Sequence, residues 1–193
     1  FHHTDDNDEK AKEQRFDAII DFSNFLRHVL KVTVDNDVSL DDKKLLQAFE
    51  IIKNDRKKIT QFAFNLLKFR VLFDRYIIKR DQAEKWSLLT LEYYTRDRNS
   101  NFSYNNSFDQ DELFGVNKQL AMILSMFHVS HPAYVYKRWL NRSLVILNTL
   151  ASGQLNVDGA AYLRELEQLR HEFLALTCSE EEQFDPAALH RGT

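Results

Sequence analysis

Two apolar segments that meet at Pro132 constrain the fold of this chain more than any other stretch. In residues 119–131 and again in residues 133–150, apolar side chains recur at the spacing of a helix with one buried face. Proline cannot continue a helix, but it fits the first turn of a new one. The sequence therefore predicts a helical hairpin or corner whose bend carries His128 and His131.

Few residues in the chain can interrupt a helix. Among its 193 residues are only 4 Gly and 2 Pro, against 15 Phe, and 44% of the residues are hydrophobic. This composition favours a folded chain with long, uninterrupted elements. We therefore predict an all-α fold, an irregular bundle of about six helices with one long polar loop. The predicted helices span residues 10–31, 40–53, 56–79, 111–127, 133–150 and 157–175.

The same patterns set the expected domain limits. Residues 1–9 are polar and acidic and are predicted to be a lead-in, whereas residues 10–177 form one helical domain. Residues 178–193 have no periodicity and are predicted to connect to a further domain. Because the chain begins with Phe1 and not with Met, we expect it to be a piece of a longer protein.

One region of the sequence fits two kinds of secondary structure. Residues 84–95 suit a short strand as well as a helix, and we favour a helix or an irregular segment. Residues 96–110 are rich in Asn and Ser and are predicted to form the long loop, held by Phe102, Tyr104 and Phe108. Loops of this length in compact domains are often functional, although a plain surface loop is the alternative.

The helix predicted at residues 56–79 combines apolar and basic side chains. It is apolar on most of its faces, so we expect neighbours to bury it on several sides. Residues 53–80 hold nine basic and two acidic side chains, a net charge of +7 in a chain whose overall charge is −3. This asymmetry predicts either a solvated helix face or a surface that contacts phosphate groups.

Basic residues near the Pro132 bend could extend such a surface, and Tyr134, Tyr136 and Trp139 lie among them. Aromatic side chains between cations are typical of nucleic-acid surfaces, whereas Trp139 at helical spacing is also typical of a core residue. The candidate DNA-contacting residues are Lys57, Lys58, Lys68, Arg70, Arg96, Arg98, Lys137, Arg138 and Arg142.

The sequence contains no recognisable catalytic or cofactor motif. It has no glycine-rich phosphate loop, no nucleophile elbow and no paired cysteine ligands. His128 and His131 stand three residues apart, but no nearby carboxylate or thiol completes a metal site. We therefore expect no metal, no cofactor and no catalytic residue, and a structural role for both histidines. His28 is expected to be a core or boundary residue.

The single cysteine indicates the cellular compartment in which the protein is expected. Cys178 excludes an intrachain disulfide, and an unpaired thiol is typical of a reducing compartment, so we expect a cytoplasmic protein. No apolar run approaches the ~20 residues of a membrane span, so no membrane partner is expected.

Four segments, in order, resemble the helical middle region of the GmrSD-type restriction proteins. They are IDFSNFLRHVLKV (20–32), VSLDDKKLLQAFE (38–50), NFSYNNSF (101–108) and ILSMFHVSHPAYVYKRWLN (123–141). These proteins are modification-dependent, type IV-like bacterial restriction systems that act against foreign DNA such as that of phages. In the family, an N-terminal ParB/sulfiredoxin-like domain carries an Asp-Gly-Gln-Gln-Arg motif and is associated with nucleotide hydrolysis. A C-terminal HNH-type domain is the nuclease.

The resemblance implies that the parent protein is a DNA endonuclease. This chain contains neither of the two family motifs, so no catalytic residue can be assigned to any position in it. The implied role is to link or position the two catalytic domains, with those domains and DNA as partners.

Two alternatives remain from the sequence. The chain could be a protein–protein scaffold with no DNA role, which predicts an exposed apolar patch, expected near the chain ends. It could also be a small hydrolase that uses His128 with a carboxylate, which requires a pocket that holds both groups.

Overall fold

The computed structural model of the chain describes residues 16–34, 38–40, 45–81, 83–96, 99–108, 115–129 and 133–182. The described helices are α2 (Phe22–Val34), α3 (Leu45–Phe49), α4 (Arg56–Tyr76), α5 (Val116–Val129), α6 (Ala133–Leu150) and α7 (Gly159–Glu182). The described strands are β1 (Phe16–Ala18), β2 (Lys79–Asp81), β3 (Trp86–Ser87), β4 (Leu89–Arg96) and β5 (Asn99–Asn106). The all-α prediction was therefore wrong, because two antiparallel sheets accompany the helices and the fold is mixed α and β.

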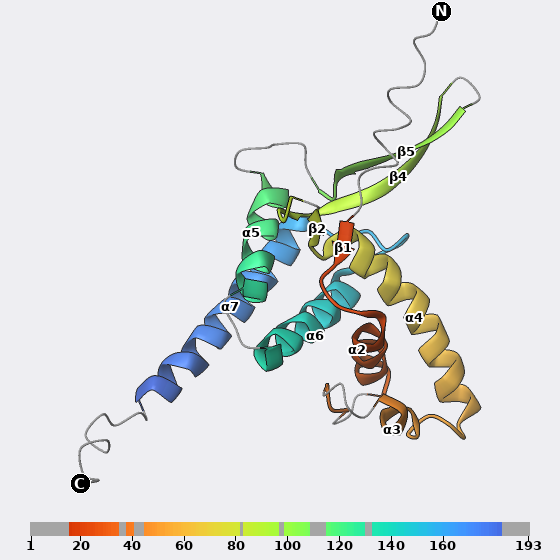
Figure 1. The fold of residues 1–193 in the computed structure, drawn as a ribbon, viewed down its shortest axis with the longest axis vertical. Helices are drawn as coiled ribbons and strands as arrows, with labels where there is room; N and C mark the ends of the chain where they lie inside the picture. The colour runs from red at the N-terminus through yellow and green to blue at the C-terminus, as the bar shows by residue number, and fades with distance from the viewer. Residues whose placement is uncertain are drawn as a thin grey trace, which may run out of the picture.

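The helices form a body around one apolar core. Helix α2 packs against α4, α6 against α4, and α7 against both α5 and α6 (Figure 1). Trp139 and Phe127 are fully buried at its centre, with their rings stacked 5.3 Å apart. The prediction that Trp139 belongs to a core face is thus confirmed. A smaller cluster of Leu30, Val38 and Ile52 lies between α2 and the region around α3.

The two helices predicted on either side of Pro132 are both present. Helix α6 has the predicted bounds, and α5 begins at Val116, later than the predicted start at residue 111. The residues of the bend itself, 130–132, lie outside the described part of the chain, as do residues 111–114. Helix α7 continues to Glu182, past the predicted end at residue 175 and into the segment predicted to be a connection.

Helix α4 begins and ends close to the predicted bounds. Asp55 caps its N-terminus, since its carboxylate accepts hydrogen bonds from the backbone N–H groups of Lys57 and Lys58. The expectation that α4 is buried on several sides is contradicted by the exposure of one face. Phe64 is 75% exposed and Leu67 is 71% exposed, whereas Phe69, Leu72, Phe73 and Tyr76 are buried. Only the face toward α2 and α6 is therefore part of the core.

The first sheet replaces part of a predicted helix. Residues 16–18, expected within a helix over 10–31, form β1 and pair antiparallel with β2, which pairs in turn with β3. Helix α2 starts only at Phe22, because the Asp21 carboxylate accepts a hydrogen bond from the backbone N–H of Asn24 at 2.7 Å. This N-cap sets the helix start six residues after β1 begins.

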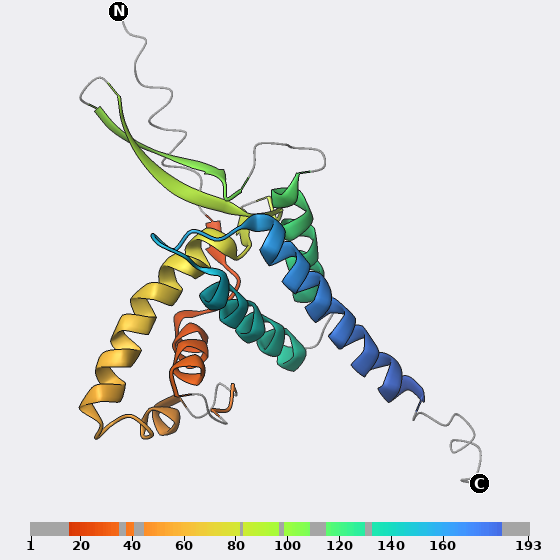
Figure 2. The same cartoon turned by 180° about the vertical axis from the view of Figure 1, so that it is seen from behind.

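The second sheet is a long two-stranded hairpin made by β4 and β5, and it projects away from the helical body (Figures 1 and 2). Its register runs from Leu89 opposite Asn106 to Arg96 opposite Asn99. The preference for a helix or irregular segment at residues 84–95 was therefore wrong, and so was the prediction of a loop over 96–110 in the residues that β5 covers. The two strands are stabilised by backbone hydrogen bonds to each other, and neither segment can form these bonds alone.

Candidate functional site

The predicted DNA-contacting residues fall into separate groups. Lys57 and Lys58 lie exposed in the first turn of α4, and Arg70 forms an ion pair with Asp74 of the same helix at 2.7 Å. Lys68 is half-buried on α4. Arg96 ends β4, with its side chain not described, and Arg98 lies outside the described residues.

The basic residues of α6 face a different neighbourhood. Lys137 donates a hydrogen bond to the backbone carbonyl of Leu40 at 3.3 Å, and Arg142 pairs with Glu172 of α7 at 3.4 Å. Arg138 is exposed between them. These contacts place the basic residues of α6 beside α7 and the segment 38–40, and the single cationic surface expected from the sequence stays a prediction.

Helix α6, helix α7, the end of α2 and the segment 38–40 line an open cavity of ≈ 620 Å³ with both polar and apolar walls. Two of the predicted residues, Arg138 and Arg142, line it, together with Lys31, which sequence reasoning did not single out. The remaining lining residues are Val38, Ser39, Leu40, Asn141, Leu169, Glu172 and Phe173. A second cavity of ≈ 280 Å³ continues along α6 and α7 and shares Arg142 and Glu172 with the first.

Two buried polar residues of α2 lie beside this cavity. Arg27 is 1% exposed, and its Nη1 donates a hydrogen bond at 3.4 Å to the carbonyl of Ser39, a lining residue. His28 is fully buried, as expected for a core histidine, and its backbone carbonyl accepts a hydrogen bond from Asn141. Burial, together with the smaller effect of the Lys137 and Lys31 charges, lowers the pKa of His28 to about 3. The imidazole is therefore neutral at physiological pH.

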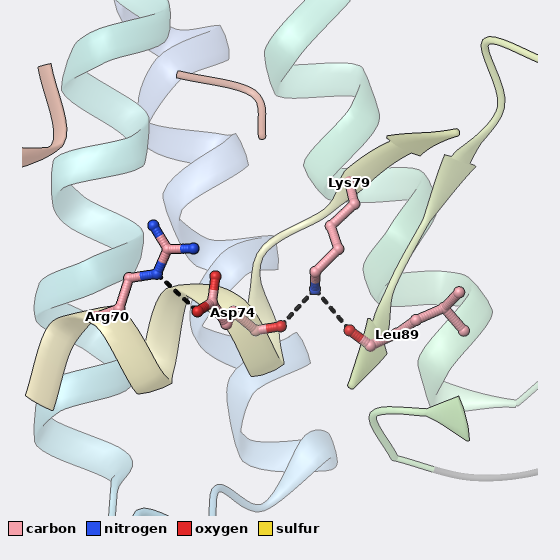
Figure 3. A network of polar contacts seen from close by, with 4 residues as sticks. All are labelled: Arg70, Asp74, Lys79 and Leu89. Atoms are coloured by element: carbon pink, nitrogen blue, oxygen red, sulfur yellow. Dashed lines mark hydrogen bonds and ion pairs between the residues drawn. The ribbon is translucent and has the colours of Figure 1, made fainter. Parts of the chain in front are cut away.

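The base of the hairpin is held to the body by side chains that bond to backbone carbonyls. Figure 3 shows Lys79, whose Nζ donates to the carbonyl of Asp74 in the last turn of α4 and, at 2.6 Å, to the carbonyl of Leu89 in β4. The carbonyl groups of the last turn of a helix have no N–H donor within that helix, and the ammonium group of Lys79 supplies a donor for the Asp74 carbonyl. Burial lowers the pKa of Lys79 to about 8, against the opposing effect of Asp74.

Other groups secure the same junction. The Asn117 side chain of α5 donates to the Leu88 carbonyl at 3.1 Å, and the Ser107 hydroxyl donates to the Arg75 carbonyl. Beyond β5, the ring of Phe108 lies so close to Gly159 that a Cβ there would be 2.7 Å from Phe108 Cδ1. Both ends of the hairpin are thus fixed to the helices.

Farther from the base, one face of the hairpin is aromatic and open. Strand alternation places Leu91, Tyr93, Phe102 and Tyr104 on this face. Tyr104 is covered by Phe16 of β1, with ring centroids 4.7 Å apart. Leu91, Tyr93 and Phe102 are 52–59% exposed, and the rings of Tyr93 and Phe102 form a cross-strand pair at 5.2 Å. We call these three residues the aromatic face.

The other residues singled out by the sequence show no site. The ring of His128 packs edge-on against Trp86 at 4.8 Å, and burial and Arg80 lower the pKa of His128. His128 lines neither of the cavities at α6 and α7 nor a smaller one between β3, β4 and α5. His131 is outside the described residues, and the side chain of Cys178 is not described. These three cavities, formed by the described residues, therefore give the hydrolase hypothesis no support.

Within the described ranges, no group of three or more His, Cys, Asp or Glu side chains is arranged to hold a metal ion. No helix in those ranges combines the length and apolarity needed to cross a membrane.

Alternation was the signal that could have revealed the aromatic face. In residues 89–94, Leu89, Leu91 and Tyr93 alternate with Thr90 and Glu92, the pattern of a strand with one apolar side. Buried Arg27 has no such signal, because arginine is rarely fully buried and looks like a surface residue in a sequence.

Comparison with family models, with curated proteins and with solved structures finds no match to this chain. The resemblance to the GmrSD-type restriction proteins is therefore a hypothesis that depends on the quoted segments of the sequence.

Proposed function

We propose that this chain is a non-catalytic interaction domain that positions the catalytic domains of a GmrSD-like restriction protein in the cytoplasm. The observation that carries the proposal is the aromatic face of a hairpin that projects from the body and is fixed only at its base (Figure 2). Isolated two-stranded hairpins are marginally stable in water, and exposed apolar patches mark interaction sites. Such a hairpin fits a docking arm whose aromatic face is covered by a partner.

The chemistry of the arm favours a protein surface as its partner. Its opposite face is mainly polar, although it carries the exposed Tyr94, and there Asn105 donates to the Glu92 carboxylate at 2.6 Å. The partner is therefore expected to cover only the side that carries Tyr93 and Phe102. This patch lies on the hairpin, whereas the chain ends, where the sequence predicts a patch, lie outside the described residues.

Site-specific photocrosslinking in the cells that make the full-length protein tests this role. A photoreactive phenylalanine analogue at Phe102 should form adducts with another domain of the parent protein, whereas the same analogue at Glu92, on the opposite face, should form few. Both variants need to retain the far-ultraviolet circular dichroism spectrum of the wild type. Adducts only with an unrelated protein favour the alternative scaffold, and equal adducts from both positions contradict a docking face.

A second candidate function, contact with DNA, is favoured by one observation. Arg138 and Arg142 of α6, which the sequence assigned to DNA, meet Lys31 of α2 at one cavity. Phosphate neutralisation by basic side chains makes DNA binding strongest at low salt. Titration of the full chain with a short DNA duplex tests this candidate, and absence of binding at low salt contradicts it.

A further inference from the structure

The cavity between α2, α6 and α7 carries an excess of positive charge. Lys31, Arg138 and Arg142 line it against one carboxylate, that of Glu172. The two guanidinium groups come from successive turns of α6, so they face the cavity from the same side. The Ser39 and Asn141 side chains add neutral hydrogen-bonding groups to the wall.

A buried guanidinium strengthens this charge from behind the wall. Arg27 is 1% exposed, and Nη2 has no hydrogen-bond partner among the described residues. Its Nη1 bonds to the backbone of Ser39, so the group lies directly against the lining segment 38–40. Arginine does not lose its proton in proteins, so this is a fixed positive charge in a poorly solvated place, where it acts more strongly than it would in water.

We propose that this cavity binds the phosphate group of a nucleotide or of a nucleic-acid backbone. Guanidinium groups form paired, charge-assisted hydrogen bonds that match the oxygen geometry of phosphate. The volume of ≈ 620 Å³ exceeds the size of a bare anion and lies in the range of small-molecule sites. The cavity therefore has room for the sugar or base that accompanies the phosphate. This inference does not depend on the aromatic face.

The ion pair between Arg142 and Glu172 regulates access to the charge. Both side chains are half-exposed and 3.4 Å apart, and both line the smaller cavity as well. An anion that enters the larger cavity competes with Glu172 for Arg142. Removing the carboxylate should consequently strengthen anion binding, whereas removing either arginine should weaken it.

Isothermal titration calorimetry on the full chain tests the site with three probes: inorganic phosphate, ATP and a short DNA duplex. Arg138→Gln and Arg142→Gln should each weaken phosphate binding about tenfold or more, since each removes charge-assisted hydrogen bonds. Glu172→Gln should strengthen it. Arg56→Gln is the matched control, because Arg56 is exposed on α4 and lines none of the three cavities described above.

The probes distinguish the two sources of the phosphate. Binding of ATP that depends on Arg138 and changes little with salt supports a nucleotide, whereas duplex binding that weakens steeply between about 50 mM and about 200 mM salt supports a nucleic-acid backbone. Failure of the wild type to bind any probe overturns the proposal, as does an equal loss in Arg56→Gln.

Two carboxylate side chains of the chain itself are alternative candidates to occupy the cavity. Asp41 and Asp42 directly follow the wall segment 38–40 in the sequence and lie outside the described residues. The double variant Asp41→Asn/Asp42→Asn isolates their effect. If the wild type binds the probe, whether as tightly as this variant or less tightly, the cavity takes an external phosphate. If only the variant binds, the chain's own carboxylates fill the cavity and the proposal is overturned.

Discussion

The helical body and the hairpin of β4 and β5 are stabilised in different ways. In the body, apolar side chains from α2, α4, α5, α6 and α7 bury one another, and Phe127, Trp139 and Leu144 are almost completely hidden from solvent. In the hairpin, Lys79 and Asn117 bind backbone carbonyls at the base, while Tyr93 and Phe102 stay exposed. The body therefore has its own apolar core, with Phe64 and Leu67 of α4 exposed outside it, whereas the hairpin has no core and keeps its aromatic face exposed.

One substitution, made once in each region, gives the largest expected difference. Phe127→Ala should lower the free energy of unfolding by about 3–5 kcal/mol, because it leaves a cavity beside Trp139 in the core. Phe102→Ala, the same change on the hairpin, should lower it by less than about 1 kcal/mol. Urea unfolding of both variants measures the contrast. Equal losses would show that the hairpin folds as part of the core.

Acid should weaken the body through His28. Since the folded-state pKa of His28 is about 3, below its ordinary value of 6.5, the unfolded chain binds more protons between these two values. Stability should therefore fall as pH drops below about 6.5, by about 1.4 kcal/mol per pH unit at most from this residue.

The variant His28→Leu tests this origin of the acid sensitivity. It should reduce the pH dependence between pH 6 and 4, leaving the smaller part that His128 contributes, and should cost little at pH 7. Neither ring nitrogen of His28 has a hydrogen-bond partner among the described residues, so the substitution breaks no hydrogen bond there. His171→Gln, at an exposed position of α7, is the control. An unchanged slope of unfolding free energy against pH in His28→Leu would assign the acid sensitivity elsewhere.

A smaller effect is expected where the two regions join. Lys79→Met should cost about 1–2 kcal/mol, because the carbonyls of Asp74 and Leu89 lose their shared donor. Hydrogen exchange should speed up mainly in β4 and β5. If exchange instead speeds up equally throughout α5 and α6, then the junction supports the core and not the hairpin alone.

The lowered pKa of Lys79 predicts a change in stability at alkaline pH. It is about 8 in the folded chain against an ordinary value of 10.5, so the folded state binds fewer protons between these values. Wild-type stability should consequently rise between pH 8 and 10.5 relative to Lys79→Met.

The contrast also explains which parts of the fold the sequence could predict. Helix α6 and the start of α4 depend on residues close together in the chain, and both were predicted correctly. The hairpin depends on a pairing of Tyr93 with Phe102, and the Asn- and Ser-rich β5 resembles a loop when it is considered alone. Alternation in residues 89–94 indicates β4, but local preferences do not reveal β5, whose hydrogen bonds come from the other strand.

The candidate cavity was predictable only in part. Arg138 and Arg142 could be proposed because they share a helix face, and the structure brings them to one cavity. Lys31 and Arg27 come from a helix far away in the sequence, and their meeting with α6 depends on tertiary packing. The exposed face of α4 was also unpredictable, since Phe64 and Leu67 are as apolar in sequence as the buried Phe69.

The close approach of Phe108 to Gly159 has a mechanical consequence. Lys79 anchors the incoming strand of the hairpin to α4, and Phe108 anchors the segment after the outgoing strand to the first turn of α7. Two anchors on different helices fix the direction of the hairpin as well as its position. A force applied to the hairpin far from its base would therefore be transmitted to the C-terminus of α4 and the N-terminus of α7 at the same time.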